Sequence, residues 1–211
     1  MAERYIITIG RQYGSGGRYV GRKVAEMLGI PFYDKELVEM AAEESGINKD
    51  LFEHADEKPS QPFWNILPVS AGGFGGRISA ADMPMNDKLF LIQANIVKKI
   101  AEQGSCVIVG RCADYILKDD PDLLRVFIHS TPEDKLNRVT KFYGVPAENA
   151  ESVMAKADKT RANYYNYYSG MKWGVAGQYD LSVNTAILGA TGTAKLIANF
   201  AKLKGHKEDE E

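Results

Sequence analysis

The sequence has 211 residues, of which 45% are apolar and 26% charged, and its formal net charge is −2. This balance is typical of one globular domain with a sizeable core, and it excludes the general electrostatic grip on nucleic acid that a basic surface provides. Only two cysteines are present, Cys106 and Cys112, which excludes a disulfide scaffold.

The sequence also predicts where the protein works. No apolar run approaches the ~20 residues that a membrane-spanning helix needs. A predicted strand begins five residues from the first methionine, which leaves no room for a signal peptide. We therefore expect a cytoplasmic protein with no membrane partner and no nucleic-acid partner.

The first predicted elements are a strand, a glycine-rich turn and a helix. Residues 5–9 are a β-prone apolar run, and residues 18–28 place apolar side chains at helical spacing. The turn between them contains Gly14, Ser15, Gly16, Gly17 and Arg18. Glycine lets backbone N–H groups approach a ligand, and the N-terminus of the following helix attracts anions. The pattern predicts a phosphate-binding loop, and a tight turn without a ligand is the alternative.

This loop departs from the usual phosphate-loop motif, G-x-x-x-x-G-K-[ST]. Counting from the end of the strand puts Gly17 at the lysine position and Arg18 at the hydroxyl position, whereas in a loop one residue longer Arg18 takes the lysine position. Arginine has the charge of lysine but binds phosphate through a planar fork. We expect Arg18 to replace the lysine, with help from Arg161 and Arg111. Ser15 stands in the wrong place to replace the hydroxyl that binds magnesium.

The middle of the chain alternates predicted strands, helices and loops. A second strand over residues 30–33 ends at Asp34, and helices are predicted over 35–44 and 48–55. Residues 57–85 are rich in proline and glycine, which predicts a long irregular insertion, either functional or without a role. A helix over 86–103 and a buried strand over 106–109 follow, and Gly110 and Arg111 come directly after that strand.

The last third repeats the alternation. A strand over 125–129 precedes Thr131 and Pro132, which are typical of a helix start. A long polar helix runs from 146 to about 164, a strand over 181–183 follows, and a final helix begins at Thr191 or Thr193. Apolar strands that alternate with helices predict a parallel sheet covered on both faces, with ligands beyond the carboxyl ends of the strands.

Six segments in order over nearly the whole chain carry a resemblance. They are ITIGRQYGSGGR, PFYDKEL, VIVGRCADYIL, VFIHSTPEDKLNRV, ADKTRANYYNYYSGMKWG and YDLSVNTAILG. Together they resemble the cytidylate kinase-like family, a branch of the nucleoside monophosphate kinases with the P-loop NTPase fold. The resemblance implies an α/β three-layer fold with a five-stranded parallel sheet of order 2-3-1-4-5. It implies one domain over 1–211, with the insertion at 57–85 and a helical lid at about 144–174.

The resemblance also implies an activity. Members of this family transfer the γ-phosphoryl group of ATP to a nucleoside monophosphate, typically CMP or dCMP, with Mg²⁺. The donor phosphates would then lie in the glycine loop, whose expected cofactor-binding residues are Gly14, Ser15, Gly16, Gly17 and Arg18. No residue is assigned to the metal.

The acceptor site and the lid receive residues in the same way. Asp34 matches the acid beside the acceptor, Arg111 matches an arginine that holds the acceptor phosphate, and Arg138 lies in a helix next to the lid where the family carries an arginine. We group these three as substrate-binding residues. Asp158, Lys159 and Arg161 match the lid motif and, with Arg18, are the expected catalytic residues.

Structural roles remain open as alternatives for these residues. Asp34 could cap the helix that follows it, Arg111 could form a structural salt bridge, and the lid residues could be a solvated helix face. In cytidylate kinases proper, acids stand at the positions of Val109 and Cys112, and the alignment of Asp114 with either acid is doubtful. Two further hypotheses therefore stay open: a nucleotide- or anion-binding module that has lost catalysis, and a kinase for a different small acceptor.

An aromatic cluster follows the lid motif. It consists of Tyr164, Tyr165, Tyr167, Tyr168 and Trp173. These rings could stack on a base or fix the lid, and a core or a subunit contact is the alternative. The alternative leaves a homo-oligomer open.

Overall fold

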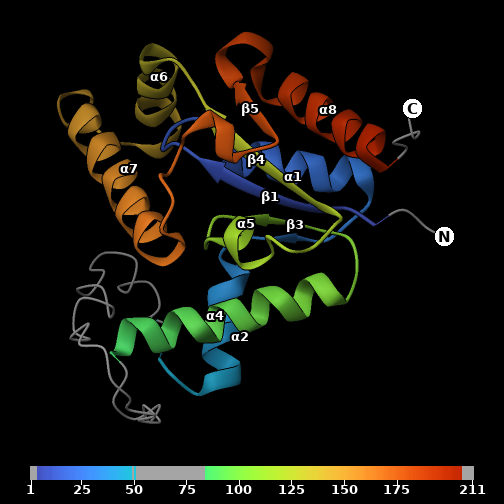
Figure 1. Ribbon diagram of the computed structural model, residues 1–211. Coiled ribbons are helices and arrows are strands. Elements are labelled where there is room, and N and C mark those ends of the chain that lie inside the picture. The colour runs from blue at the N-terminus through green and yellow to red at the C-terminus, as the bar shows by residue number, and fades with distance from the viewer. Residues whose placement is uncertain (1–3, 49, 51–83, 206–211) are drawn as a thin grey trace, which may run out of the picture.

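The computed structural model describes residues 4–48, 50 and 84–205. Its strands form one parallel sheet in the order β2-β3-β1-β4-β5 (Figure 1). The strands are β1 (Ile6–Arg11), β2 (Phe32–Tyr33), β3 (Cys106–Val109), β4 (Leu123–His129) and β5 (Leu181–Asn184). The predicted fold class and strand order are confirmed.

Helices connect these strands. They are α1 (Gly17–Leu28), α2 (Glu36–Ser45), α4 (Met85–Glu102), α5 (Ala113–Ile116), α6 (Pro132–Tyr143), α7 (Ala147–Ser169), α8 (Thr185–Gly205) and the 3₁₀ helix η2 (Ala176–Gln178). The predicted start of the final helix, at Thr191 or Thr193, lies just after a break in α8 at Gly189 (φ 62°, ψ 174°), and the short helical segment that begins at Thr185 before this break was not predicted. The short helix α5 was not predicted. Most of the predicted helix over 48–55 and of the insertion over 57–85 lies outside the described residues.

The central strands send alternate side chains into two apolar cores. Ile6 and Ile108 pack with α2, α4 and α5 on one face of the sheet. Ile7 and Val107 pack with α1 and α8 on the other face (Figure 1). Because helices cover both faces, both sets of side chains are mainly apolar, which explains why these strands do not alternate between apolar and polar residues in the sequence. Neither cysteine forms a disulfide, and both are buried.

Helices α6 and α7 lie side by side near the turn that follows β1 (Figure 1). A small core of Val139, Ala150 and Met154 joins them, and Tyr13 packs against it. This contact fixes the glycine loop against two helices that come from a distant part of the sequence. None of the described helices is long and apolar enough to span a membrane.

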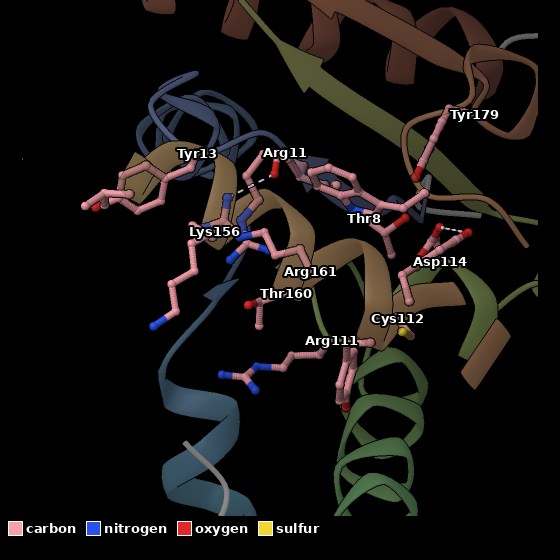
Figure 2. Close-up of a pocket in the computed structure, with 18 residues that line it drawn as sticks. Thr8, Arg11, Tyr13, Arg111, Cys112, Asp114, Lys156, Thr160, Arg161 and Tyr179 are labelled. Atoms are coloured by element: carbon pink, nitrogen blue, oxygen red, sulfur yellow. Dashed lines mark hydrogen bonds between the residues drawn. The ribbon is translucent and has the colours of Figure 1, made fainter. Parts of the chain in front are cut away.

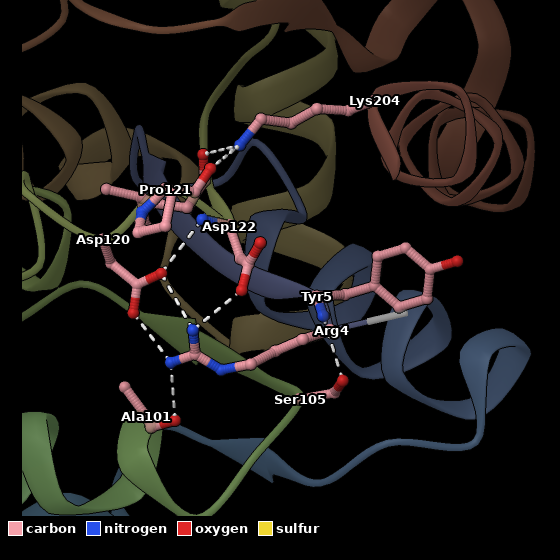
Figure 3. A network of polar contacts seen from close by, with 9 residues as sticks. Arg4, Tyr5, Ala101, Ser105, Asp120, Pro121, Asp122 and Lys204 are labelled. Atoms are coloured by element: carbon pink, nitrogen blue, oxygen red, sulfur yellow. Dashed lines mark hydrogen bonds and ion pairs between the residues drawn. The ribbon is translucent and has the colours of Figure 1, made fainter. Parts of the chain in front are cut away.

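Arg4 joins the start of β1 to the loop before β4 (Figure 3). Its guanidinium donates to Asp120 Oδ2 at 2.7 Å and to Asp122 Oδ2 at 2.8 Å, and it also donates to the Ala101 carbonyl at 2.9 Å. These carboxylates raise the pKa of Arg4 through their hydrogen bonds to it. Three elements therefore depend on one partly buried side chain for their contact at this end of the sheet.

The Arg4→Ala variant is expected to lose about 1–2 kcal/mol in free energy of unfolding, because several charge-assisted hydrogen bonds disappear together. Urea denaturation measures the loss. The Lys99→Ala variant is the matched control, since the Lys99–Glu44 pair joins two side chains that are 56% and 45% exposed. That pair should contribute less than about 0.5 kcal/mol. Equal losses in the two variants would contradict a special role for Arg4.

Candidate active site

The glycine loop wraps the N-terminus of α1. Gly14 and Gly16 have φ values of 77° and 78°, in the left-handed region that glycine adopts without strain. Helix α1 begins at Gly17 and has no acidic side chain in its first turn. The Thr185 hydroxyl donates to the carbonyl of Ser15 at 2.8 Å and holds the loop from the side of α8. The result is a fixed turn whose helix end is suited to an anion.

Arg138 of α6 lies directly against this loop. A β-carbon at Gly16 would collide with Nη1 of Arg138. Nη2 pairs with Asp134 at 3.1 Å, whereas the buried Nη1 has no hydrogen-bond acceptor among the described residues. A phosphate oxygen would satisfy such a donor. The structure thus places Arg138 beside the predicted donor loop and not with the acceptor residues, with which we grouped it.

A cavity of about 540 Å³ opens beyond the carboxyl ends of β1 and β3, beside α7. Its lining combines basic side chains with aromatic ones: Arg11, Arg111, Lys156 and Arg161 with Tyr13, Tyr164, Tyr165, Trp173 and Tyr179. Figure 2 shows Arg11, Lys156 and Arg161 on one side of this space and Asp114 and Tyr179 on the other. The cavity therefore has a cationic side and a side with an acid and aromatic rings.

Asp158 and Arg161 tie α7 to the loop. The Tyr13 amide donates to Asp158 Oδ1 at 2.6 Å, and Arg161 Nη1 donates to the Arg11 carbonyl at 3.2 Å. The two side chains form an ion pair at 3.5 Å, and the Arg161 guanidinium stands 5.5 Å from the ring centroid of Tyr13. Burial nevertheless raises the pKa of Asp158 and lowers the pKa of Arg161. An anionic ligand beside Arg161 would stabilise its buried charge.

The turn after β3 is strained. Gly110, Arg111 and Cys112 have φ values of 77°, 59° and 53° in succession. The left-handed conformation costs a residue other than glycine about 1–2 kcal/mol, and such strain gathers at functional sites. The turn brings Arg111 to the cavity wall (Figure 2).

Asp34 and Arg18 meet at the end of β2. Arg18 Nε lies 2.5 Å from Asp34 Oδ2, and Arg11 Nη2 lies 3.9 Å from Asp34 Oδ1. Asp34 is buried, whereas the side chain of Arg18 is 48% exposed. Arg11 lines the cavity, whereas Arg18 is not among the described residues that line it. The Arg18 side chain is therefore directed toward Asp34.

The loop does not fit a magnesium ion held by protein side chains. The position that normally supplies a hydroxyl carries Arg18, and the Ser15 hydroxyl already donates to the Gln12 carbonyl at 2.8 Å. Within residues 4–48, 50 and 84–205, no group of three or more His, Cys, Asp or Glu side chains could hold a metal ion. Asp34, the acid that follows β2, is paired with two guanidinium groups.

Asp114, in the cavity wall, should make the free energy of unfolding depend on pH. Burial raises its pKa, although the Tyr165 hydroxyl donates to it at 2.9 Å. The folded protein then keeps this proton to higher pH than the unfolded chain, so the carboxyl lowers stability as the pH rises from about 4 through its folded pKa. The Asp114→Asn variant keeps an acceptor for Tyr165. It should be more stable than the wild type at pH 8, with the difference vanishing below about pH 4.

Denaturation curves at several pH values measure this difference. The Asp119→Asn change, at an exposed position, is the control and should leave the pH profile unaltered. An Asp114→Asn variant that is less stable than the wild type at pH 8 would show that the ionised carboxyl is favourable in this wall.

Comparison with known proteins shows the family of this chain. A family model described as the cytidylate kinase-like family matches residues 6–187. The chain belongs to this family. It is also similar to a curated cytidylate kinase from Methanopyrus kandleri, with 23% identity over 191 residues that cover 86% of this chain and 84% of the relative.

Solved structures show the same architecture. An uncharacterized protein from Eubacterium ventriosum has 30% identity and a TM-score of 0.69, covering 94% of this chain and 99% of that one. A shikimate kinase from Bacteroides thetaiotaomicron has 14% identity and a TM-score of 0.54, with 94% and 98% covered. One from Acinetobacter baumannii, in complex with shikimate, has 16% identity and a TM-score of 0.53, with 98% and 97% covered. The two shikimate kinases share the fold with this family member.

Helical spacing explains which α7 residues of this family member reach the cavity. The α7 residues in its wall are Val153, Lys156, Ala157, Thr160, Arg161, Tyr164 and Tyr165, which recur every three or four positions. Lys159 falls between them and is exposed. Sequence reasoning chose Lys159 from the family pattern and missed Lys156 and Thr160, although the spacing from Arg161 could have identified them.

Proposed function

We propose that this protein transfers the γ-phosphoryl group of ATP to a nucleoside monophosphate, with CMP or dCMP as the acceptor. The observation that carries the proposal is the cavity beside the glycine loop, with its cationic side and its side of aromatic rings and Asp114. A nucleoside monophosphate has the same division, since an anionic phosphate is joined to a flat base with polar edges. The choice of CMP and dCMP rests on the family and on the name of the curated relative.

Phosphoryl transfer needs positioning and charge neutralisation more than covalent chemistry. In this proposal the loop amides and Arg138 hold the donor phosphates. Arg111 and Lys156 hold the acceptor phosphate, and Arg161 neutralises the charge of the group in flight. Asp158 fixes the first part of the loop through the Tyr13 amide at 2.6 Å, so it positions Arg161 and the loop together.

ATP is the proposed donor and Mg²⁺ the proposed metal, both implied by membership of the cytidylate kinase-like family. Since the described residues supply no loop hydroxyl for the ion, no step is assigned to it.

A second candidate is a nucleotide- or anion-binding module without catalysis. The ion pair between Arg18 and Asp34 favours this candidate. Arg18 stands at the position that normally supplies a hydroxyl, and its Nε lies 2.5 Å from Asp34 Oδ2, so the two side chains already engage each other. This candidate predicts nucleotide binding that depends little on Mg²⁺ and is not followed by transfer.

A coupled assay for ADP release tests the proposal. The full chain is incubated with ATP and Mg²⁺ and with CMP, dCMP, UMP, AMP or GMP, and with shikimate and gluconate as non-nucleotide acceptors. We expect turnover with CMP or dCMP. A folded sample that binds ATP but turns over none of the acceptors favours the second candidate, and turnover with shikimate or gluconate alone identifies a kinase for a different acceptor.

A further inference from the structure

The position of the absent loop lysine is already filled by another side chain. Helix α1 begins at Gly17, the lysine position of the motif counted from the end of the strand. An ideal β-carbon on Gly17 would lie 2.5 Å from Cβ and 3.0 Å from Cγ of Arg11. No side chain can stand at position 17 while Arg11 keeps this place.

The motif itself shows a reciprocal exchange. In G-x-x-x-x-G-K the first glycine stands six residues before the lysine. With Gly17 at the lysine position, that first glycine is replaced by Arg11, so this loop reads R-x-x-x-x-G-G. The positive charge has moved from the last position of the motif to the first, and the glycine has moved the opposite way.

The head of Arg11 lies where the loop and the cavity meet. A β-carbon on Gly110, at the end of β3, would collide with Arg11 Nη1, and Nη2 lies 3.9 Å from Asp34 Oδ1. The Arg11 carbonyl accepts from Arg161 Nη1 at 3.2 Å (Figure 2). Gly17 and Gly110 therefore form the two walls of a slot in which the arginine stem and head lie. The slot leads from the start of α1 to the cavity.

We propose that Arg11 binds the β- and γ-phosphates of the donor in place of the loop lysine, and that glycine is required at position 17 to admit it. The proposal rests on the proposed function only in taking ATP as the donor. It assigns to Arg11 the role that sequence reasoning gave to Arg18. Arg18 is paired with Asp34 at 2.5 Å, is about half exposed and lies outside the cavity wall.

Calorimetric titration of the full chain with ATP and with AMP, without an acceptor, tests this assignment. The Arg11→Ala variant should weaken ATP binding by about 10- to 100-fold, the range for loss of hydrogen bonds to a charged group. Binding of AMP, which has neither a β- nor a γ-phosphate, should change by less than about 3-fold. The Arg11→Lys variant keeps the positive charge without the planar fork, so its affinity for ATP should lie between those of the wild type and the Arg11→Ala variant.

The decisive variant reverses the exchange. The double change Arg11→Gly with Gly17→Lys recreates G-x-x-x-x-G-K, and its affinity for ATP should lie within about 10-fold of the wild type. The single change Gly17→Lys should not bind ATP in this way, because Arg11 occupies the space that the lysine needs. Thermal melting of each variant identifies any loss that comes from unfolding. If Arg11→Ala cannot fold, Arg11→Lys and the double variant decide the question.

Three results would overturn the assignment. The Arg11→Ala variant could bind ATP as tightly as the wild type, the Arg18→Ala variant could be the one of the two that loses ATP affinity, or the wild type could bind no ATP. Failure of the proposed function is a separate result. A wild type that binds ATP through Arg11 but phosphorylates no acceptor removes the kinase proposal and keeps the role of Arg11. Normal turnover of an acceptor by the Arg11→Ala variant removes the role of Arg11 and keeps the kinase proposal.

Discussion

The Arg161→Ala variant is expected to lower kcat/KM for phosphoryl transfer by about 10³-fold or more, since one arginine that neutralises a phosphoryl-transfer transition state contributes about 10³–10⁵. Arg161 projects from α7 into the cavity wall, where it donates to the Arg11 carbonyl, and burial lowers its pKa. Its charge is therefore stabilised most when an anionic group is beside it. The Arg161→Lys variant should recover little, because lysine lacks the planar fork. Steady-state kinetics with thermal melting measure both effects.

The Lys159→Ala variant separates two explanations of the lid motif. The family pattern predicts a large loss at this position. The exposed place of Lys159 on α7 predicts a change below about 3-fold, as for other surface substitutions. The exposed Asn163→Ala change is the control for truncating a side chain on the same helix. A loss at Lys159 equal to that at Arg161, or a loss below about 10-fold at Arg161, would contradict the geometry.

The fold could be predicted from the sequence because its signals are local. The unbroken apolar run at 106–109 is strand β3 with the same bounds, since both of its faces are buried. Thr131 caps α6 as predicted, and its hydroxyl accepts from the Asp134 amide at 3.2 Å. The part of α8 after Gly189 was predicted, and only the segment that begins at Thr185 was missed, because the few residues before Gly189 are too short to show a helical period.

The site could be predicted only in part, because side-chain direction depends on distant elements. Arg111 and Asp34 follow strands, and the rule for parallel sheets placed both at the ligand edge. Arg18 and Arg11 stand at either end of one loop, and the sequence does not say which of them turns toward the cavity. That choice is made by Asp34, which holds Arg18, and by the slot beside Gly17, which admits Arg11.

The Gly14→Ala variant is expected to lose about 2–5 kcal/mol in free energy of unfolding, from left-handed strain and from crowding of a packed contact. Gly14 has a φ of 77°. A β-carbon there would lie 2.8 Å from Cγ2 of the buried Val139 and 3.1 Å from the carbonyl oxygen of Lys135. Because one of these atoms belongs to the backbone of α6, a side-chain rotation cannot relieve the contact. The helix and the loop must separate, and ATP binding should weaken with stability.

The Gly29→Ala variant isolates the crowding. Gly29 lies at the C-terminal end of α1, the helix that follows the glycine loop, and has a φ of 66°. A β-carbon at Gly29 would have no atom within 4 Å. The variant should therefore lose only the strain, about 1–2 kcal/mol, and keep ATP binding. Urea denaturation and nucleotide titration on both variants measure the contrast. If the two losses were equal, the contact between α6 and the loop would contribute nothing beyond backbone conformation.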